Sequence, residues 1–170
     1  LKIEKNKHTI ITGPNGSGKS TLLGLSAGLL FSQEGKIESF SNRFGYVGVT
    51  PLIVPGTLRE NLLYGNIKNI QDKELLEYID KFQLFNEKSG NDLDKTVNNK
   101  TLSSGQLQKI SFIRSLLAEV DVLLLDESTS NLDENSRKLI FELLKNSEIT
   151  IINSTHNHQD FEYDNHLKIE

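Results

Sequence analysis

The sequence predicts an α/β fold, in which a sheet with parallel strands is combined with a separate group of helices. A β-branched run at 9–12 leads into a glycine-rich segment and then into leucines at helical spacing. Two later apolar runs, 122–125 and 150–154, are continuous, as in parallel strands that are buried on both faces. Between these features, apolar residues recur at helical intervals within 57–87 and 104–119.

The composition is that of one ordinary globular domain. The 170 residues are 36% hydrophobic and 25% charged, which suffices for one core. A net charge of −4 gives no basic field of the kind that drives general polynucleotide binding, so we expect no nucleic-acid partner. The absence of cysteine excludes disulfides and cysteine metal sites and fits a reducing compartment. No apolar run approaches the roughly 20 residues that span a bilayer, so we expect no membrane crossing.

The segment before residue 36 is predicted to form two short strands and a helix. An alternating pattern at 1–4 and the β-branched run at 9–12 indicate strands joined by a polar turn. A helix begins near Lys19, and we expect it to end before Gly35. Its leucines recur at helical spacing, at positions 22, 23, 25, 29 and 30.

Strand signals continue as far as Val47. Ile37 and Tyr46-Val47 indicate two further strands. Pro51, Pro55 and Gly56 then interrupt regular structure, so a non-helical stretch is expected there.

Helices are predicted to dominate the middle of the chain. The segment 57–87 is polar, with leucines at helical intervals, and indicates a small helical subdomain. The segment 86–100 has the composition of a polar linker, and 104–119 is predicted to be a further helix with one apolar face. The buried strands 122–125 and 150–154 follow. Both end in polar residues, which parallel sheets present at their carboxyl edge, where α/β folds bind ligands.

A phosphate-binding loop is indicated by Gly13-Pro14-Asn15-Gly16-Ser17-Gly18-Lys19-Ser20, which fits G-x-x-x-x-G-K-[ST]. Its glycines let backbone N–H groups curl around phosphates, and the following helix adds unpaired N–H groups and the positive end of its dipole. Lys19 is expected to contact the β- and γ-phosphates, Ser20 to offer its hydroxyl to Mg²⁺, and Thr21 to bind a phosphate oxygen. A turn that merely caps a helix is the alternative, which the strand–loop–helix context disfavours.

An acidic pair, Asp126-Glu127, ends the apolar run 122–125. Adjacent residues at a strand end point in different directions, so Asp126 can hold the Mg²⁺ hydration shell while Glu127 addresses the attacking water. Mg²⁺ keeps several waters and prefers oxygen ligands, which suits Ser20, phosphate oxygens and a water-linked Asp126. Without the upstream loop, two acids at a solvated strand end would be an ordinary alternative.

Further segments resemble those of the ATP-binding cassette (ABC) ATPases, in the order found in that family. Leu102-Ser103-Ser104-Gly105-Gln106 resembles the LSGGQ signature, Ser130-Asn131-Leu132-Asp133 resembles the D-loop, and Thr155-His156 resembles the switch-histidine loop. Pro55 to Leu62 resembles a segment typical of export-type cassettes, including the subfamily whose first cassette has a shortened β-subdomain. The resemblance covers essentially all 170 residues.

This resemblance implies an ATPase that works as a head-to-tail pair, in which the signature of one cassette closes over ATP held by the other. Contacts in trans with the partner's nucleotide are therefore implied for Ser103, Ser104, Gly105, Gln106 and Asp133. Ser103 and the N–H groups around Ser104 and Gly105, at a helix N-terminus, suit a γ-phosphate. Taken alone, Ser103-Ser104 could be only a helix N-cap, and Asp133 a turn acid with Asn131.

Three catalytic residues are expected. Lys19 neutralises phosphate charge, Glu127 polarises water, and His156 is implied by the resemblance to steady the γ-phosphate and Glu127. The other histidines, His8, His158 and His166, are read as ordinary core or surface residues.

The implied setting is a membrane transporter. The resemblance implies ATP and Mg²⁺ as cofactors. It implies a second cassette and transmembrane domains, fused or separate, as partners, at the cytoplasmic face of a membrane. Two alternative functions remain open: a regulatory cassette with little turnover, and a non-transport ABC ATPase that acts on chromosomes or ribosomes. The exporter-like segment and the lack of a basic surface argue against the latter.

Three departures from the family pattern stand out. Val49 occupies the position where the Q-loop glutamine is expected, and Ser104 replaces the first glycine of the signature. The adenine-stacking strand and the C-terminal helices of a full cassette are expected to lie outside 1–170, so we expect a fragment with weakened adenine affinity.

The predicted architecture is thus one ABC ATPase domain over 1–170. A P-loop NTPase sheet core is assigned to 1–48 and 118–170. A helical subdomain that carries the signature is assigned to 49–117.

Overall fold

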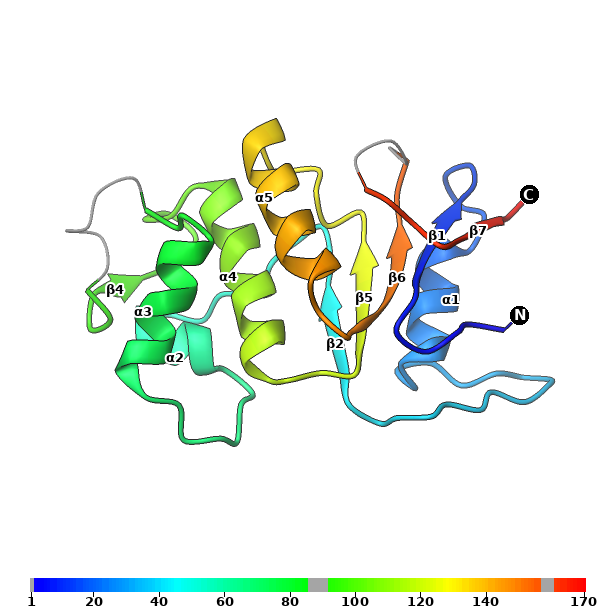
Figure 1. Cartoon of the computed structure of the whole chain (residues 1–170), viewed down its shortest axis with the longest axis horizontal. Helices are drawn as coiled ribbons and strands as arrows, with labels where there is room; N and C mark the ends of the chain where they lie inside the picture. The colour runs from blue at the N-terminus through cyan, green and yellow to red at the C-terminus, as the bar shows by residue number, and fades with distance from the viewer. Residues whose placement is uncertain (1, 86–91, 157–160) are drawn as a thin grey trace.

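A parallel β-sheet forms the centre of the chain in the computed structural model, which describes residues 2–85, 92–156 and 161–170 (Figure 1). Within these residues the sheet has five strands in the order β2-β5-β6-β1-β7, and every neighbouring pair is parallel. The α/β fold predicted from the sequence is confirmed. The strands are β1 (His8–Thr12), β2 (Phe44–Val47), β5 (Val122–Asp126), β6 (Thr150–Ser154) and β7 (Asn165–Lys168).

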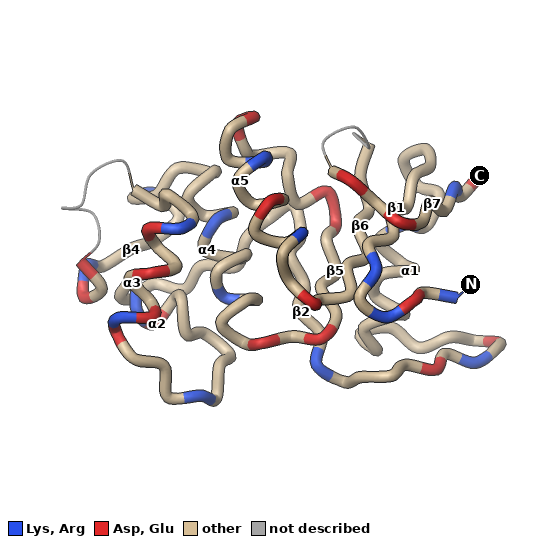
Figure 2. The backbone as a smooth tube through the Cα atoms, in the orientation of Figure 1, with Lys and Arg blue, Asp and Glu red and all other residues tan. Residues whose placement is uncertain are grey.

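The helices lie on both faces of this sheet and beyond its β2 edge (Figure 1). Helices α2, α3 and α4 gather beside β2, together with a short antiparallel pair formed by β3 (Gly56–Thr57) and β4 (Thr96–Val97). The helices are α1 (Lys19–Ser26), α2 (Leu58–Leu63), α3 (Asp72–Lys81), α4 (Ser104–Leu117) and α5 (Glu134–Lys145). Acidic and basic residues are interspersed over these elements (Figure 2).

The two faces of β5 pack against different elements. Leu123 and Leu125 belong to a large apolar cluster that includes the buried sides of α2, α3, α4 and α5. Val122 and Leu124 belong to a second cluster, which contains Leu23 of α1. Since successive side chains of a strand point to opposite faces, a strand covered on both sides needs apolar residues throughout. This packing explains the continuous apolar run.

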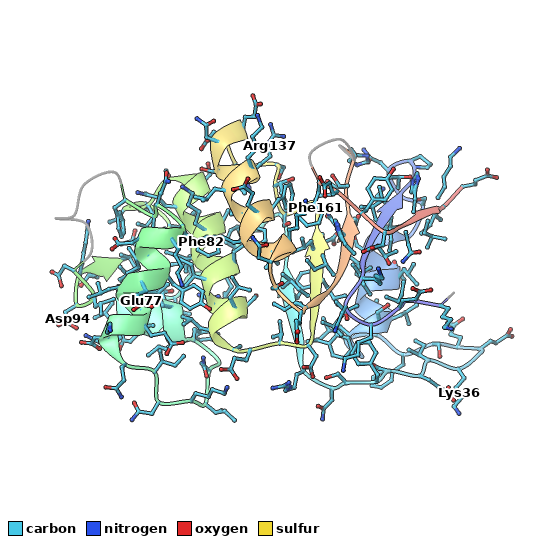
Figure 3. All side chains as sticks on the ribbon, viewed as in Figure 1. Lys36, Glu77, Phe82, Asp94, Arg137 and Phe161 are labelled. Carbon is cyan, nitrogen blue, oxygen red and sulfur yellow. The ribbon has the colours of Figure 1, made fainter. Side chains whose placement is uncertain are left out.

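Two aromatic side chains, Phe82 and Phe161, pack in or against the larger cluster (Figure 3). Phe82, just after α3, is completely buried. Phe161 lies between α5 and the start of β1, with its ring 4.3 Å from that of Phe141 and 3.8 Å from that of His8. Phe161 therefore ties the segment before β7 to both elements.

The first helix is shorter than the leucine pattern predicts. The prediction that it extends as far as Leu30 is wrong, because α1 ends at Ser26. Gly28 has a φ of +71°. The N–H groups of Gly28 and Leu29 donate to carbonyl groups of the last helical turn, an arrangement that closes helices at a left-handed glycine. Leu29 and Leu30 consequently lie outside the helix and are exposed.

Two predicted strands and part of a predicted linker are also wrong. Residues 2–4 and the segment around Ile37 form no strand, and residue 1 lies outside the described residues. Ile37 is half exposed. Of the predicted linker 86–100, residues 86–91 lie outside the described part. The remainder contains β4 and the buried Leu93.

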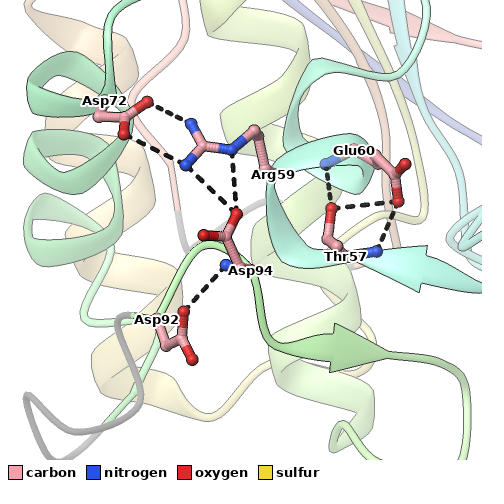
Figure 4. Close-up of polar contacts among 6 residues, drawn as sticks. All are labelled: Thr57, Arg59, Glu60, Asp72, Asp92 and Asp94. Atoms are coloured by element: carbon pink, nitrogen blue, oxygen red, sulfur yellow. Dashed lines mark hydrogen bonds and ion pairs between the residues drawn. The ribbon is translucent and has the colours of Figure 1, made fainter.

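Polar contacts fix the start of α2 (Figure 4). The Glu60 N–H donates to Thr57 Oγ1 at 3.1 Å, and the Thr57 N–H donates to Glu60 Oε2 at 2.7 Å, which forms a capping box. Arg59 forms ion pairs with Asp72 of α3 and, at 3.4 Å, with Asp94 before β4. The export-type segment thus begins a helix and is linked to its neighbours.

The proposed division into a core at 1–48 and 118–170 and a helical subdomain at 49–117 stays a prediction. The apolar faces of α2, α3 and α4 share one cluster with β5 and α5. Helix α5 and strand β7 were not expected from the sequence. Among the described residues, no helix has the length and apolar character that a membrane span requires.

Candidate active site at the carboxyl edge of the sheet

The predicted glycine-rich loop, the acidic pair and His156 meet at one edge of the sheet. The glycine-rich loop follows β1, Asp126 ends β5, and His156 lies two residues beyond β6. These three strands are adjacent and parallel, and their register pairs Ser154 with both Ile11 and Asp126. Their carboxyl ends therefore face the same side, where parallel sheets bind ligands.

The glycine-rich loop has the backbone that its sequence demands. Gly16 and Gly18 have φ values of +81° and +92°, which L-residues rarely adopt. An added Cβ would meet nothing at either position, so conformation and not space requires glycine there. At Gly13 the lack of space requires glycine, because an added Cβ would lie 2.4 Å from the Ile169 carbonyl oxygen. Pro14 and Asn15 form the exposed tip of the loop.

Lys19 folds back into this loop. It is only 5% exposed, and its ammonium group donates to the carbonyl oxygens of Gly13 and Pro14, at 2.9 Å each. The positive charge is thereby held at the centre of the loop. An anion placed there would meet it directly.

Further donors at the loop lack acceptors. The first helical hydrogen bond of α1 runs from the Leu22 N–H to the Gly18 carbonyl at 2.9 Å. The amides of Lys19, Ser20 and Thr21 precede it and have no helical acceptor. The Ser17 hydroxyl is buried and has no hydrogen-bond partner among the described residues. Buried polar groups are nearly always satisfied, so these donors fit a loop built to surround a phosphate.

Asp126 is buried at the end of β5 and is held by a residue that the sequence did not point to. The Tyr46 hydroxyl of β2 donates to Asp126 Oδ2 at 2.8 Å. Burial, with this hydrogen bond as the next cause, raises the pKa of Tyr46 to about 12. The phenol therefore remains a donor near neutral pH. Only tertiary structure brings it there, because the two residues lie 80 positions apart.

Glu127 leaves the strand direction abruptly. Its φ is +49°, a left-handed conformation that is costly for a residue with a side chain. Its N–H donates to the Ser154 carbonyl oxygen at 2.9 Å, which holds this turn against β6. His156 Nε2 lies 2.9 Å from Glu127 Oε1. Both side chains are partly exposed at the sheet edge, so the structure brings together Glu127 and His156 where a solvent molecule can reach them.

The signature segment begins α4. The Gln106 N–H donates to Ser103 Oγ at 3.2 Å, and the Ser103 N–H donates to Gln106 Oε1 at 2.9 Å, a capping box. In the single chain, the helix-cap reading of Ser103 is therefore correct. Ser104 lies exposed at the first helical position, and Leu102 is buried. Contacts of these residues with another chain's nucleotide stay a prediction.

The D-loop lies against the signature segment. Asp133 caps α5, accepting from the Ser136 N–H at 2.9 Å and the Ser136 hydroxyl at 2.7 Å, and these bonds lower the pKa of Asp133. The Asn131 carbonyl oxygen would lie 3.5 Å from a Cβ added to Gly105. Asp133 is thus a helix cap in this chain, and its predicted role in trans stays a prediction.

The segment at the expected Q-loop position is held by its backbone. The Gly48 carbonyl accepts from Gln108 Nε2 of α4 at 3.0 Å, and the Val49 carbonyl accepts from Asn131 Nδ2 at 3.0 Å. The Val49 side chain is 44% exposed, so it does not serve as core packing. Gln108 was not predicted as a site residue, because the sequence indicates only that position 108 lies in a helix.

Figure 1 shows the start of α4 and the glycine-rich loop on opposite sides of β5 and β6. A separate hollow of about 730 Å³ lies between α1 and the segment 32–40, lined by Leu22, Leu25 and Phe40 among others. It contains none of the predicted site residues. His158 lies outside the described residues.

Comparison with known proteins gives consistent matches. The family model described as "ABC transporter" matches residues 1–130. The chain is 32% identical to "ATP-dependent permease MDL1" of Candida albicans, over 92% of this chain and 26% of that protein.

Two further relatives show the same pattern. The chain is 32% identical to "ABC transporter B family member 15" of Arabidopsis thaliana, over 85% of this chain and 13% of that protein. It is 29% identical to "Glutathione/L-cysteine transport system ATP-binding/permease protein CydD" of Haemophilus influenzae, over 85% of this chain and 27% of that protein. The chain thus spans about a quarter or less of the length of these relatives.

Proposed function

We infer that this chain, which belongs to the ABC transporter family, is the ATP-hydrolysing domain of a membrane exporter and works in a head-to-tail pair with a second such domain. One observation carries the inference. Three adjacent parallel strands end at the same edge of the sheet, and at these ends lie the glycine-rich loop, the Asp126 carboxylate and the contact between Glu127 and His156. Binding and cleavage of one triphosphate need these groups on the same side of the sheet.

ATP binding is assigned to the loop at 13–21. The unpaired amides at the start of α1 and the buried Ser17 hydroxyl offer hydrogen bonds to phosphate oxygens. Lys19 is expected to exchange its bonds to the loop carbonyls for the β- and γ-phosphates. The cation is already inside the loop, so little rearrangement is required for this exchange.

The residues available for Mg²⁺ fit its chemistry. Ser20 is exposed in the first turn of α1, and Asp126 offers the carboxylate oxygen that Tyr46 does not bind. A hydroxyl and a carboxylate, together with phosphate oxygens and waters, are the hard oxygen ligands that Mg²⁺ prefers. When bound, the ion neutralises charge on the transferred phosphoryl group.

Glu127 and His156 are assigned to the cleavage step, in which ATP and water give ADP and phosphate. Phosphoryl transfer needs mainly positioning and charge stabilisation. We assign Glu127 to accept a hydrogen bond from the attacking water and orient it toward the γ-phosphate. His156, already 2.9 Å from Glu127 Oε1, is assigned to hold that carboxylate in place and to contact the γ-phosphate.

The partner domain is proposed to supply Ser103, Ser104, Gly105, Gln106 and Asp133 to each nucleotide. The separation of the signature helix from the glycine-rich loop within one chain supports contact in trans. Transmembrane domains, fused or separate, are proposed as the second partner at the cytoplasmic face of a membrane. The names of the relatives, which include a permease and a transport system, support this setting.

The test is the substitution Glu127→Gln in the intact protein, with Glu77→Gln on the exposed side of α3 as the matched control. We expect Glu127→Gln to lose ATP hydrolysis, retain ATP binding and stabilise an ATP-dependent pair, because the amide keeps the shape but is a weaker acceptor for water. Phosphate release, nucleotide affinity and mass in the presence of ATP are measured. Wild-type turnover in Glu127→Gln would remove Glu127 from the reaction.

Two further measurements separate the alternatives. Lys19→Ala should abolish nucleotide binding, and unchanged affinity would contradict the assignment of the loop. A wild-type protein that binds ATP but releases no phosphate would instead favour a regulatory cassette, the reading that Val49 supports by offering no side-chain oxygen.

A further inference from the structure

We propose that Tyr46 positions the carboxylate of Asp126, and that Gln108 of α4 holds the loop against which Tyr46 packs. Helix α4, which starts in the signature segment, would then be connected to the Mg²⁺ side of the site through Gln108, Gly48, Tyr46 and Asp126. This inference rests on the proposed function. It assigns roles to residues whose chemistry does not by itself suggest them.

The first contact fixes the orientation of Asp126. Strands β2 and β5 pair in parallel with Tyr46 opposite Leu124, so the phenol reaches along the sheet to the carboxylate two residues on. The hydroxyl donates to Oδ2 at 2.8 Å. With Oδ2 engaged, Oδ1 remains to accept from a metal-bound water. Such outer contacts set the orientation of the groups that hold a metal.

The second contact fixes Tyr46 itself. A Cβ added to Gly48 would lie 2.9 Å from Tyr46 Cε1 and 3.5 Å from its hydroxyl oxygen. The phenol ring therefore lies directly against the Gly48 backbone. Movement of this short loop would move the ring, and any side chain at position 48 would displace it.

The third contact joins the loop to the signature helix. Gln108 is completely buried, four residues after Ser104 and so one turn further along α4. Its Nε2 donates to the Gly48 carbonyl at 3.0 Å, whereas its Oε1 is buried and has no partner within residues 2–85, 92–156 and 161–170. An unsatisfied buried acceptor is destabilising, and an apolar side chain of the same size would avoid it. Such an apolar side chain at position 108 could not donate a hydrogen bond to the Gly48 carbonyl, as the Gln108 amide does.

Because Val49 offers no polar side-chain atom, the loop after β2 can be connected to the site only through its backbone and through Tyr46. A branched apolar side chain at the Q-loop position can neither bind the metal nor accept from a donor. The loop is nevertheless held at two successive carbonyl groups, by Gln108 from α4 and by Asn131 from the D-loop. Displacement of α4 when a partner closes over the nucleotide would reach Asp126 through the backbone of this loop and the ring of Tyr46.

The experiment is a Mg²⁺ titration of the binding of a fluorescent ATP analogue to the intact protein, in wild type, Tyr46→Phe, Gln108→Met and the double variant. Tyr46→Phe should raise the half-saturating Mg²⁺ concentration about tenfold, the usual effect of losing an outer-shell contact. Gln108→Met should raise it about threefold, as expected for one neutral hydrogen bond. Binding of the analogue without Mg²⁺ should stay as in wild type for both.

The double variant distinguishes a connected path from two separate effects. If Gln108 acts through Tyr46, the double variant should resemble Tyr46→Phe, whereas independent effects would multiply. Tyr163→Phe removes an exposed phenol outside the site. Lys109→Met removes a different side-chain bond from α4, to the Gln83 carbonyl. Both controls should keep the wild-type Mg²⁺ dependence.

Gly48→Ala provides a second route to the same displacement, without removing any polar group. It should raise the half-saturating Mg²⁺ concentration as Tyr46→Phe does. If Tyr46→Phe or Gln108→Met fails to fold, Gly48→Ala tests the positioning of Asp126 by Tyr46. Wild-type Mg²⁺ dependence in Tyr46→Phe and Gly48→Ala would overturn the inference. Multiplied effects in the double variant would overturn the connection to α4. If wild type binds no ATP analogue at any Mg²⁺ concentration, the proposed function fails instead.

Discussion

Acidification is expected to destabilise the fold through one buried histidine. His8 begins β1 and is 7% exposed. Because the Glu162 carbonyl oxygen can only accept, the 2.8 Å contact requires His8 Nδ1 to carry the proton. Nε2 is then the unprotonated nitrogen, and it is buried with no hydrogen-bond partner within the described structure. Protonation would place an unpaired N–H and a charge next to the ring of Phe161.

The direction and size of the effect follow from the pKa of His8. Burial lowers this pKa from 6.5 to about 4, although the Glu162 carbonyl and the nearby Asp164 carboxylate act in the opposite direction. The folded value lies below the unfolded one, so between pH 6.5 and 4 the unfolded chain binds the additional proton and stability falls as the pH falls. A difference of this size corresponds to about 2 kcal/mol lost between pH 8 and pH 5, and to about 3 kcal/mol below both pKa values.

The assay is urea unfolding at a series of pH values for wild type and His8→Asn. The asparagine amide retains a donor near the position of Nδ1 and does not titrate. His166→Asn, on the adjacent β7, controls for the removal of an imidazole as such. We expect the free energy of unfolding of His8→Asn to vary less with pH than that of wild type, by about 2 kcal/mol between pH 8 and 5. Parallel pH profiles for wild type and His8→Asn would refute the reasoning.

Two other substitutions test the loop after β2 and the contacts of α2. Val49→Gln introduces an amide oxygen at a side chain that is already 44% exposed, and it should raise the ATPase rate or lower the Mg²⁺ requirement, by roughly ten- to a hundredfold if the contact forms in the transition state. Thr50→Val is the comparison, and loss of activity there would indicate that Thr50 already supplies the oxygen. Arg59→Met removes exposed ion pairs with Asp72 and Asp94, so it should lower the urea midpoint slightly at low salt, and the difference should shrink in about 1 M salt. A salt-independent difference would show that packing, not charge, carries the effect.

The parts of the site that could be predicted are those whose chemistry is local in sequence. The loop at 13–20 needs glycine where φ is positive, and Gly16 and Gly18 have such values. The acids at 126 and 127 follow an apolar strand whose two faces are both covered. In each case a few consecutive residues determine both the backbone and the chemistry, so the sequence pattern is sufficient.

The contacts that were missed join distant parts of the chain. Tyr46 reaches Asp126 across 80 residues, Gln108 reaches Gly48 across 60, and Asn131 reaches Val49 across 82. No periodicity reports such pairs, because each depends on strand order and helix packing.

Two local signals were nevertheless present and not used. Gly28 marks the end of α1. Asp133, whose side chain accepts from the Ser136 N–H, marks the start of α5. The first would have shortened the predicted helix, and the second would have added one.

The proposed nucleotide site is divided into two halves that lie apart in a single copy of the chain. The glycine-rich loop, the acidic pair and His156 lie at the ends of β1, β5 and β6. The start of α4 lies on the opposite side of β5 and β6 from the glycine-rich loop (Figure 1). In the part of the chain that the structure describes, the Ser103 hydroxyl accepts from its own helix, through the capping box with Gln106. If the halves meet only between copies, the ATPase activity per molecule of residues 1–170 alone should be low and should rise with protein concentration. Activity that is high and independent of concentration would require every catalytic contact to form within one chain, and would contradict the head-to-tail pair.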